Sequence, residues 1–271
     1  MAAEVARRSR PSPLLALGQV RYQLLLLLRS PLGFFITLVI PLLLLISLNI
    51  VTPGTAAHMP GGLGYAQFLT PAMSTFCLLN ACYVTTITSM VLAREQGLLK
   101  RLRGTPLPAW AYLGGRSGSA LATSVVSVGI IIATAGVFFH VTIVWRAMGY
   151  FSAAAGLGMV CFFLLGVAVT TAVPKSDTAL PVAYGTVLPL AFISGVFYPS
   201  VHAPHWLNDV ASAFPVAPVA RATEAAFNPA TRSWPMPPAG LLVVLGWSAA
   251  AAVVIALAFR WEPGPIRWHA A

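Results

Sequence analysis

Six long apolar runs, separated by short segments that carry most of the charges, constrain this chain more than any other feature. A helix needs roughly 20 mostly apolar residues to cross a lipid bilayer. No Asp, Glu, Lys or Arg lies near the middle of any run. We place the runs at about 31–52, 67–92, 112–139, 148–173, 181–199 and 239–260.

Composition leads to the same class. Apolar residues make up 58% of the chain and charged residues only 8%, whereas soluble domains carry about one quarter charged residues. The sequence therefore predicts an all-α polytopic membrane protein with six transmembrane helices and no soluble domain. We expect a cytoplasmic N-terminus with an interfacial helix over 1–30, one membrane domain over 31–260 and a cytoplasmic tail over 261–271.

The distribution of Lys and Arg predicts the orientation of the chain. With both termini in the cytoplasm, 13 of the 16 basic residues lie in inner segments, and only Arg146, Arg221 and Arg232 lie outside. Such an excess on one side is typical of cytoplasmic loops. The net charge of +10 is spread over these loops, so it does not indicate a nucleic-acid partner. The strong preference for Arg over Lys suggests a GC-rich bacterium, and hence a bacterial cytoplasmic membrane.

Two segments depart from simple spans. Residues 10–30 are predicted to form an amphipathic helix on the inner membrane surface, with Arg21 and Arg29 reaching the headgroups; alternatively, they extend the first span inward. Pro31 would separate the two elements. The fifth run is interrupted by prolines, and we expect it to end near Ser194, followed by short re-entrant helices in the outer leaflet. An ordinary outer loop is the alternative.

Several kinds of chemistry are missing from the sequence. There is no phosphate-binding G-x-x-x-x-G-K-[ST] loop, and the predicted spans lack the carboxylates that ion-coupled carriers use. His202, His205 and Asp209 are a weak zinc candidate, and more simply they belong to a short helix at the surface. The three cysteines at 77, 82 and 161 are expected to be packing residues. We therefore expect no catalytic residue, cofactor or metal in this chain.

The inner loop between the second and third runs reads LAREQGLLKRLRGTPLPAWAYLGGR. We expect Glu95 in the first turn of a short helix and Lys100 and Arg101 toward its end, which suits a helix dipole. Thr105–Pro106 would stop that helix. The helix would then have an apolar face and a basic face, suited either to anionic lipid or to a groove in a partner protein.

This loop resembles the signature loop of type-2 ATP-binding-cassette (ABC) exporter permeases, approximately E-x-G-T-L-K-R-L-x-x-T-P-L, with Leu98 in place of the usual Thr. The matching residues are Glu95, Gly97, Leu99, Lys100, Arg101, Leu102, Thr105, Pro106 and Leu107. A second stretch resembles the outer segment of the same family. Its matching residues are Gly195, Tyr198, Pro199, Pro204, Trp206 and Pro215.

The resemblance implies a half-transporter. Two permease copies, identical or similar, would combine with two separate ATPase subunits that bind ATP and Mg²⁺. The helix at 95–106 and the N-terminal helix would sit on those ATPases. The uncharged spans favour a hydrophobic or amphiphilic drug or lipid as cargo. Polysaccharide or glycolipid export, an ion-coupled carrier and a non-transporting subunit of a membrane complex are the alternatives.

Aromatic and methionine residues within the runs are possible lining of a path for such a cargo, although residues at this spacing more often make helix contacts. The candidates are Phe76, Tyr83, Met90, Phe162, Phe163 and Phe192.

Overall fold

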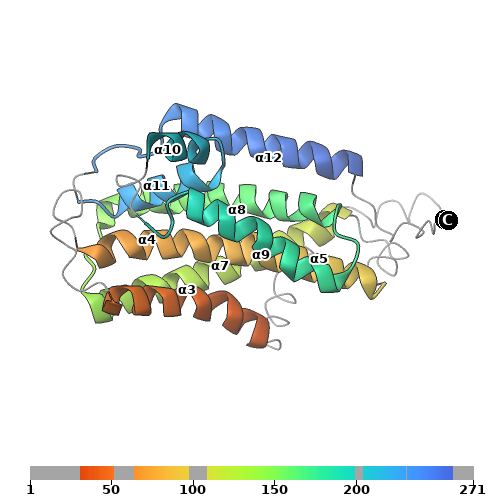
Figure 1. Ribbon diagram of the computed structural model, residues 1–271, viewed down its shortest axis with the longest axis horizontal. Coiled ribbons are helices and arrows are strands. Elements are labelled where there is room, and N and C mark those ends of the chain that lie inside the picture. The colour runs from red at the N-terminus through yellow and green to blue at the C-terminus, as the bar shows by residue number, and fades with distance from the viewer. Residues whose placement is uncertain (1–30, 52–63, 98–108, 199–203, 230, 259–271) are drawn as a thin grey trace, which may run out of the picture.

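The computed structural model describes residues 31–51, 64–97, 109–198, 204–229 and 231–258. Every regular element in these ranges is a helix, and the long helices run side by side along the longest axis of the molecule (Figure 1). In chain order they are α3 (Pro31–Val51), α4 (Tyr65–Leu78), η3 (Leu79–Val84), α5 (Thr85–Glu95), α7 (Ala109–Phe139), η4 (Trp145–Ala147), α8 (Met148–Thr170), α9 (Ser176–Ile193), α10 (His205–Ser212), α11 (Val216–Ala226) and α12 (Pro238–Ala258).

Five helical segments are long and apolar enough to cross a membrane. They are 65–95, 114–139, 145–170, 176–193 and 238–258. The predicted all-helical membrane fold is thereby confirmed. The first predicted run coincides with α3, but its described apolar part, 37–51, is shorter than the roughly 20 residues that a span requires. The count of six spans therefore stays a prediction.

The fifth span is shifted from its predicted position. It was placed at 181–199, whereas α9 runs from Ser176 to Ile193. The helix ends there because Gly195 adopts a left-handed φ of 76°, which only glycine adopts without strain. The prediction that this span ends near Ser194 is confirmed, and its start was placed five residues too late because polar residues begin the helix.

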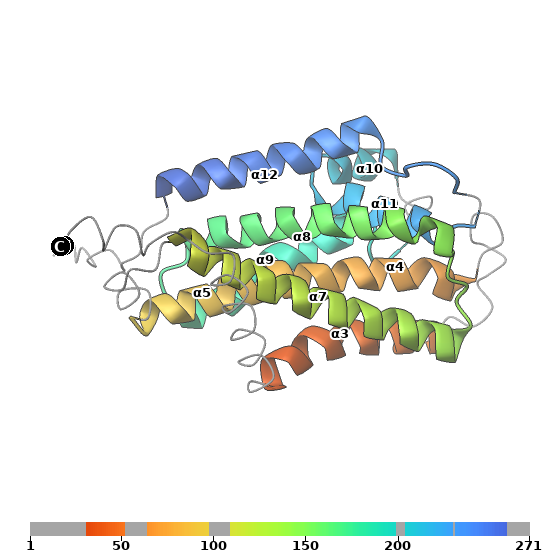
Figure 2. The same ribbon diagram turned by 180° about the vertical axis from the view of Figure 1, so that it is seen from behind.

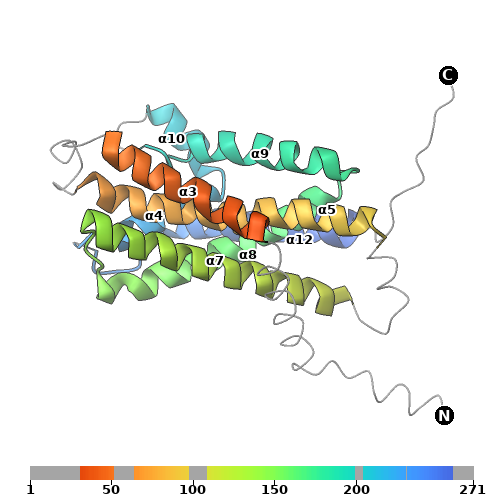
Figure 3. The same cartoon turned by 90° about the horizontal axis from the view of Figure 1, so that it is seen from below.

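The centre of the bundle is the continuous rod of α4, η3 and α5. About 72% of its most apolar window is buried inside the protein, compared with 11% for α12. Figure 3 shows α9 and α7 on opposite sides of this rod. The rod contains a π-helical turn, η3, and Gly166 of α8 packs closely there. A Cβ atom at Gly166 would lie 3.1 Å from the carbonyl oxygen of Tyr83.

The connection between α9 and α12 folds back into the bundle. As predicted, it forms short helices, α10 and α11. α11 packs against α8 and α4, and Val219 is fully buried beside Gly158, where a Cβ would come within 2.8 Å of it. α11 is therefore part of the core of the protein, whereas α10 is largely exposed. That these helices enter the outer leaflet stays a prediction.

Gln67 ties this connection to the rest of the protein. Its amide nitrogen donates hydrogen bonds to the carbonyl oxygens of Thr142 and Phe227, each 2.8 Å away, and its oxygen accepts one from the Thr142 backbone N–H at 3.0 Å. Gln67 is buried. One side chain thus joins the start of α4, the α7–α8 connection and the end of α11.

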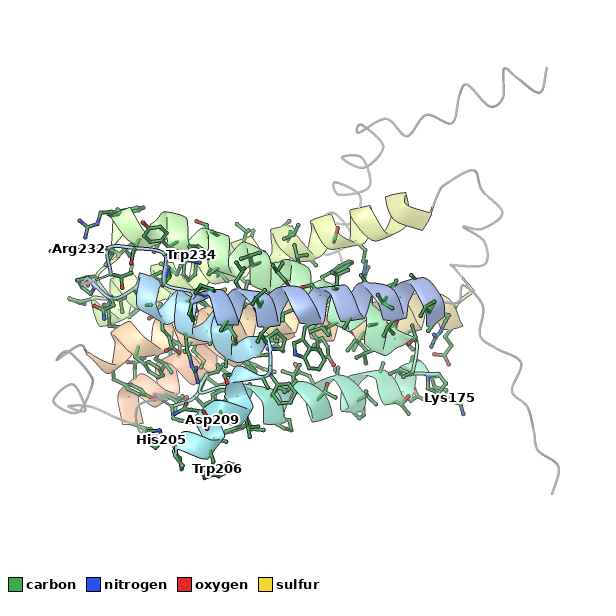
Figure 4. All side chains as sticks on the ribbon, turned by 90° about the horizontal axis from the view of Figure 1, so that it is seen from above. Lys175, His205, Trp206, Asp209, Arg232 and Trp234 are labelled. Carbon is green, nitrogen blue, oxygen red and sulfur yellow. The ribbon has the colours of Figure 1, made fainter. Side chains whose placement is uncertain are left out.

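The bundle has two ends, which we call the Glu95 end and the Trp206 end. Figure 4 shows Lys175 at the first, and Trp206, Asp209 and Arg232 at the second. The described basic residues are distributed between the ends as the loop assignment predicts. Which end faces the cytoplasm stays a prediction.

Candidate functional site

The described part of the signature loop begins where α5 ends. Glu95 is the last residue of α5, and Gly97 has a left-handed φ of 66°. The backbone N–H of Gly97 donates to the carbonyl oxygen of Arg94 at 3.1 Å, as is common where a glycine ends a helix. The expectation that Glu95 lies in the first turn of a new helix is therefore wrong, because it closes the membrane helix before the loop.

Arg94 joins this end of α5 to α8. Its guanidinium donates a hydrogen bond to the carbonyl oxygen of Thr170 at 3.0 Å and another to that of Val173. Thr170 is the last residue of α8. Carbonyl groups at a helix C-terminus lack partners within the helix and carry partial negative charge, so a cation is favourable there.

Glu95 makes the complementary contact with α9. Its carboxylate accepts a hydrogen bond from the backbone N–H of Ser176, the first residue of α9, at 3.1 Å. The N-cap residue of α9, Lys175, provides no side-chain cap. Glu95 thus takes the place of a capping side chain. The prediction that Glu95 matches the dipole of a loop helix is therefore wrong; it lies at the N-terminus of α9, where an acid is favourable.

Most of the remaining predicted site lies outside the described residues. This applies to Leu99, Lys100, Arg101, Leu102, Thr105 and Pro106 in the loop, to Arg21 and Arg29 in the N-terminal segment, and to Pro199 in the outer segment. Their roles stay predictions.

The outer segment is described more fully. Gly195 provides the left-handed turn after α9, and the Tyr198 hydroxyl donates to the carbonyl oxygen of Ile193 at 3.4 Å. Pro204 precedes α10, Pro215 precedes α11, and Trp206 is 66% exposed. These residues shape turns and helix starts. His205 and Asp209 are exposed on α10, and the described residues include no group of three potential metal ligands.

A buried polar group at the π turn was missed by the sequence analysis. The Tyr184 hydroxyl of α9 donates to the side-chain oxygen of Asn80 at 3.0 Å, and the hydroxyls of Tyr83 and Thr186 lie 2.9 Å apart. Both pairs join η3 to α9. Charge patterns do not reveal this group, because an uncharged amide such as Asn80 also needs partners when it is buried.

Glu224 on α11 was also missed, because it lies in the connection after the fifth run. The packing of α11 against α4 and α8 surrounds Glu224 with protein, although part of its side chain stays exposed. This burial raises the pKa of Glu224 to about 8, and the positive charge of Arg221 opposes the rise only in part.

The suggested lining residues are mostly core residues. Phe76, Met90 and Phe162 are buried almost completely, and Tyr83 is 7% exposed. Phe192 on α9 is 56% exposed. Within the described bundle, the buried members contribute to packing between helices.

Comparison with known families decides the class of the protein. The sequence model of the ABC-2 type transporter family, which describes its membrane domain, matches residues 19–227. The chain belongs to this family. The match includes α3 to α11 and the whole signature loop. This permease is therefore a multi-pass membrane subunit of an ABC transporter. Its membrane domain implies an ABC ATPase as its partner. No curated protein matches the chain.

Proposed function

We propose that this permease is the membrane half of an ATP-driven exporter that moves a hydrophobic or amphiphilic molecule, a drug or a lipid, out of the cell. Two copies, or this chain and a similar one, act with two separate ATPase subunits that bind ATP and Mg²⁺. The observation that supports this most directly is the pair of contacts made by Arg94 and Glu95, since they link the start of the signature loop to two membrane helices.

These contacts provide a route for mechanical coupling. An ATPase that moves the loop after Gly97 also moves the end of α5, to which α8 and α9 are attached through Arg94 and Glu95. Nearer the middle of the rod, in η3, Tyr83 and Asn80 bind the same rod to α9 again. The rod and α9 are therefore expected to move together rather than to slide past each other.

α9 is suited to movement. It is the least apolar of the five spans, and only 22% of its most apolar window is buried. It contains Pro181 and Pro189, each of which removes a backbone donor within the helix. Its exposed face, which includes Phe192, faces lipid or a second permease copy.

The chemical class of the cargo is inferred from the lack of charged residues near the middle of the spans. The five described spans carry no acidic or basic residue near their middle, and an unpaired ion is costly in such surroundings. Polysaccharide or glycolipid export is the alternative within the same family. The ion-coupled carrier is disfavoured, because the five described spans carry no carboxylate near their middle and Glu224 lies on α11, outside those spans.

Reconstitution tests this proposal. Proteoliposomes would contain the permease alone or the permease with the ABC ATPase that co-purifies with it, and export of a lipophilic dye would be followed. We expect export to require the ATPase and ATP, and Glu95→Ala or Arg101→Glu to reduce it roughly tenfold or more. Gln96→Ala, an exposed neighbour of Glu95, is the matched control. Gradient-driven transport by the permease alone would overturn the proposal.

The orientation is a separate part of the proposal: both termini lie in the cytoplasm of a bacterium. It is tested in a variant whose three buried cysteines are replaced by alanine. In intact cells, Lys100→Cys should resist a membrane-impermeant thiol reagent, and His58→Cys should react with it. The opposite labelling would show that the chain is inverted.

A further inference from the structure

An apolar groove runs between α7 and α12 in the half of the bundle nearer to the Glu95 end. Its volume is about 440 Å³, within the range of sites for small molecules. Figure 2 shows α12 and α7 on either side of α8. The lining residues on α7 are Gly114, Ser117, Ala120 and Leu121, and those on α12 are Ala252, Ile255 and Ala256.

The groove exists because the two helices that wall it do not pack on each other. α12 packs on α8 and α11, whereas α7 packs on α4, η3 and α3. Residues of α8, including Met159 and Phe163, form the floor together with Cys82 of η3. Most wall residues are glycine, serine or alanine, whose small side chains leave space between the two helices.

The groove is open toward the surroundings of the bundle. Leu121 and Val160 line it, and they are 38% and 54% exposed. Its lining is almost entirely apolar. Water does not occupy a space that offers it no hydrogen-bonding partners, and an empty groove would leave its walls without van der Waals contacts.

The groove reaches only halfway along the bundle. α7 contributes residues 114–121 of a span that continues to 139, and α12 contributes only residues from its last two turns. Toward the Trp206 end, α11 packs against both α8 and α12 and closes the space. A helix of a second copy would need a face along the whole span, whereas one acyl chain of a single leaflet fits half of it.

A charged residue near the groove indicates which class of lipid would bind there. Arg116 is half-buried on α7 and precedes Ala120 by four residues, so it lies on the same side of that helix, toward its start. A lipid with its chain in the groove would place its headgroup toward Arg116.

We propose that the groove between α7 and α12 binds one acyl chain of an anionic phospholipid from the leaflet at the Glu95 end, as a resident lipid of the permease. Arg116 favours the negatively charged headgroup. The site is distinct from a path beside α9, because it opens to the outside of the bundle and no residue of α9 lines it.

Native mass spectrometry of the full-length permease tests this, after release from nanodiscs that contain equal amounts of phosphatidylglycerol and phosphatidylcholine. We expect the wild type to retain phosphatidylglycerol in preference to phosphatidylcholine. Ala252→Phe and Ala256→Phe, which fill the groove from its exposed wall, should lower retention roughly tenfold. Val253→Phe, an equally large change at a neighbouring position that is 56% exposed and does not line the groove, should retain lipid as the wild type does.

Arg116→Gln separates the headgroup from the chain. We expect this variant to keep a bound phospholipid but to lose the preference for phosphatidylglycerol. The proposal would be overturned by a wild type that retains no phospholipid, by groove-filling variants that retain as much as Val253→Phe, or by groove-filling variants that instead abolish crosslinking between two permease copies. Retention of an exported amphiphile in place of phospholipid would likewise overturn it, whether or not the export assay succeeds.

Discussion

The two ends of the bundle are held together in different ways. At the Trp206 end, α11 is folded into the bundle, and its contacts are buried: Gln67 reaches the carbonyl oxygen of Phe227, and the hydroxyls of Thr75 and Thr223 lie 2.8 Å apart. At the Glu95 end, two adjacent side chains reach across to the termini of neighbouring helices, and one of them, Glu95, is exposed.

The difference has a mechanical consequence. Buried hydrogen bonds are costly to break because each partner then loses both its bond and its access to water. Exposed charged contacts contribute little to stability, because water replaces them readily. The Trp206 end is therefore expected to be the rigid end, and the Glu95 end can rearrange at low cost, which suits the end that a partner ATPase would move.

The largest effect on stability is expected at Gln67. Gln67→Leu leaves the backbone groups of Thr142 and Phe227 without their partner, and this should lower the free energy of unfolding by about 2–4 kcal/mol. Thermal unfolding in detergent measures the change. Gln96→Leu at the exposed Glu95 end is the control and should unfold like the wild type. Equal losses in the two variants would remove the contrast between the ends.

A smaller loss is expected between the two ends, at Gly166. Gly166→Ala places a Cβ atom 3.1 Å from the carbonyl oxygen of Tyr83 and 3.3 Å from that of Cys82. The backbones must separate, at a cost of about 1–3 kcal/mol. The matched control is Gly156→Ala on the same helix, where no atom lies within 4 Å, and it should be neutral or slightly stabilising. The same unfolding assay compares them, and a neutral Gly166→Ala would contradict the close packing of α8 on the π turn.

The stability of the protein is expected to depend on pH through Glu224 at the Trp206 end. Because burial raises the pKa of Glu224 to about 8, the folded protein binds a proton that the unfolded chain releases at its ordinary pKa of about 4.3. The unfolded chain therefore binds fewer protons in this interval, and stability falls as pH rises from about 4.5 to about 8.

Melting temperatures of the wild type and Glu224→Gln at several pH values check this. The glutamine variant cannot ionise, so its melting temperature should fall less over this interval. Parallel curves for the two proteins would show that Glu224 is ionised in the folded state.

The smallest effect on stability is expected at Glu95. Glu95→Ala removes an exposed contact with the Ser176 N–H, so its melting temperature should stay close to that of the wild type even though export falls. This pairing of intact stability with lost export is what distinguishes coupling from folding. A large drop in melting temperature would instead make Glu95 a structural residue and would place a rigid contact at the end proposed to move.

The Glu95 loop shows which features a local sequence pattern predicts and which it does not. The motif identified the family, and Gly97 was included in the predicted site. The acid and the basic residues that follow it were interpreted as one helix, because charges near each other in sequence suggest a shared dipole. The partner of Glu95 is 81 residues away, and a pattern within the loop contains no information about a helix that begins at Ser176.

The polar residues within the spans show the same limit. The sequence contains Gln67, Asn80 and Tyr184, but it does not show that their partners lie on other helices. Apolar runs predict where helices occur because each helix satisfies its own backbone, and lipid requires this. Contacts between helices depend on rotation and depth in the bundle, which hydropathy does not encode.

The sequence by itself therefore determined the helical membrane class, the positions of the runs to within a few residues, the segregation of basic loops and the family. The first three follow from the transfer of side chains between water and hydrocarbon, which each residue undergoes largely independently of its distant neighbours. The family follows from a motif whose residues are close together in sequence. Only the tertiary structure decided that Glu95 caps α9, that α11 is folded into the core, and that α7 and α12 leave a groove between them. Those features depend on which helices approach one another, and hence on the packing of the whole bundle.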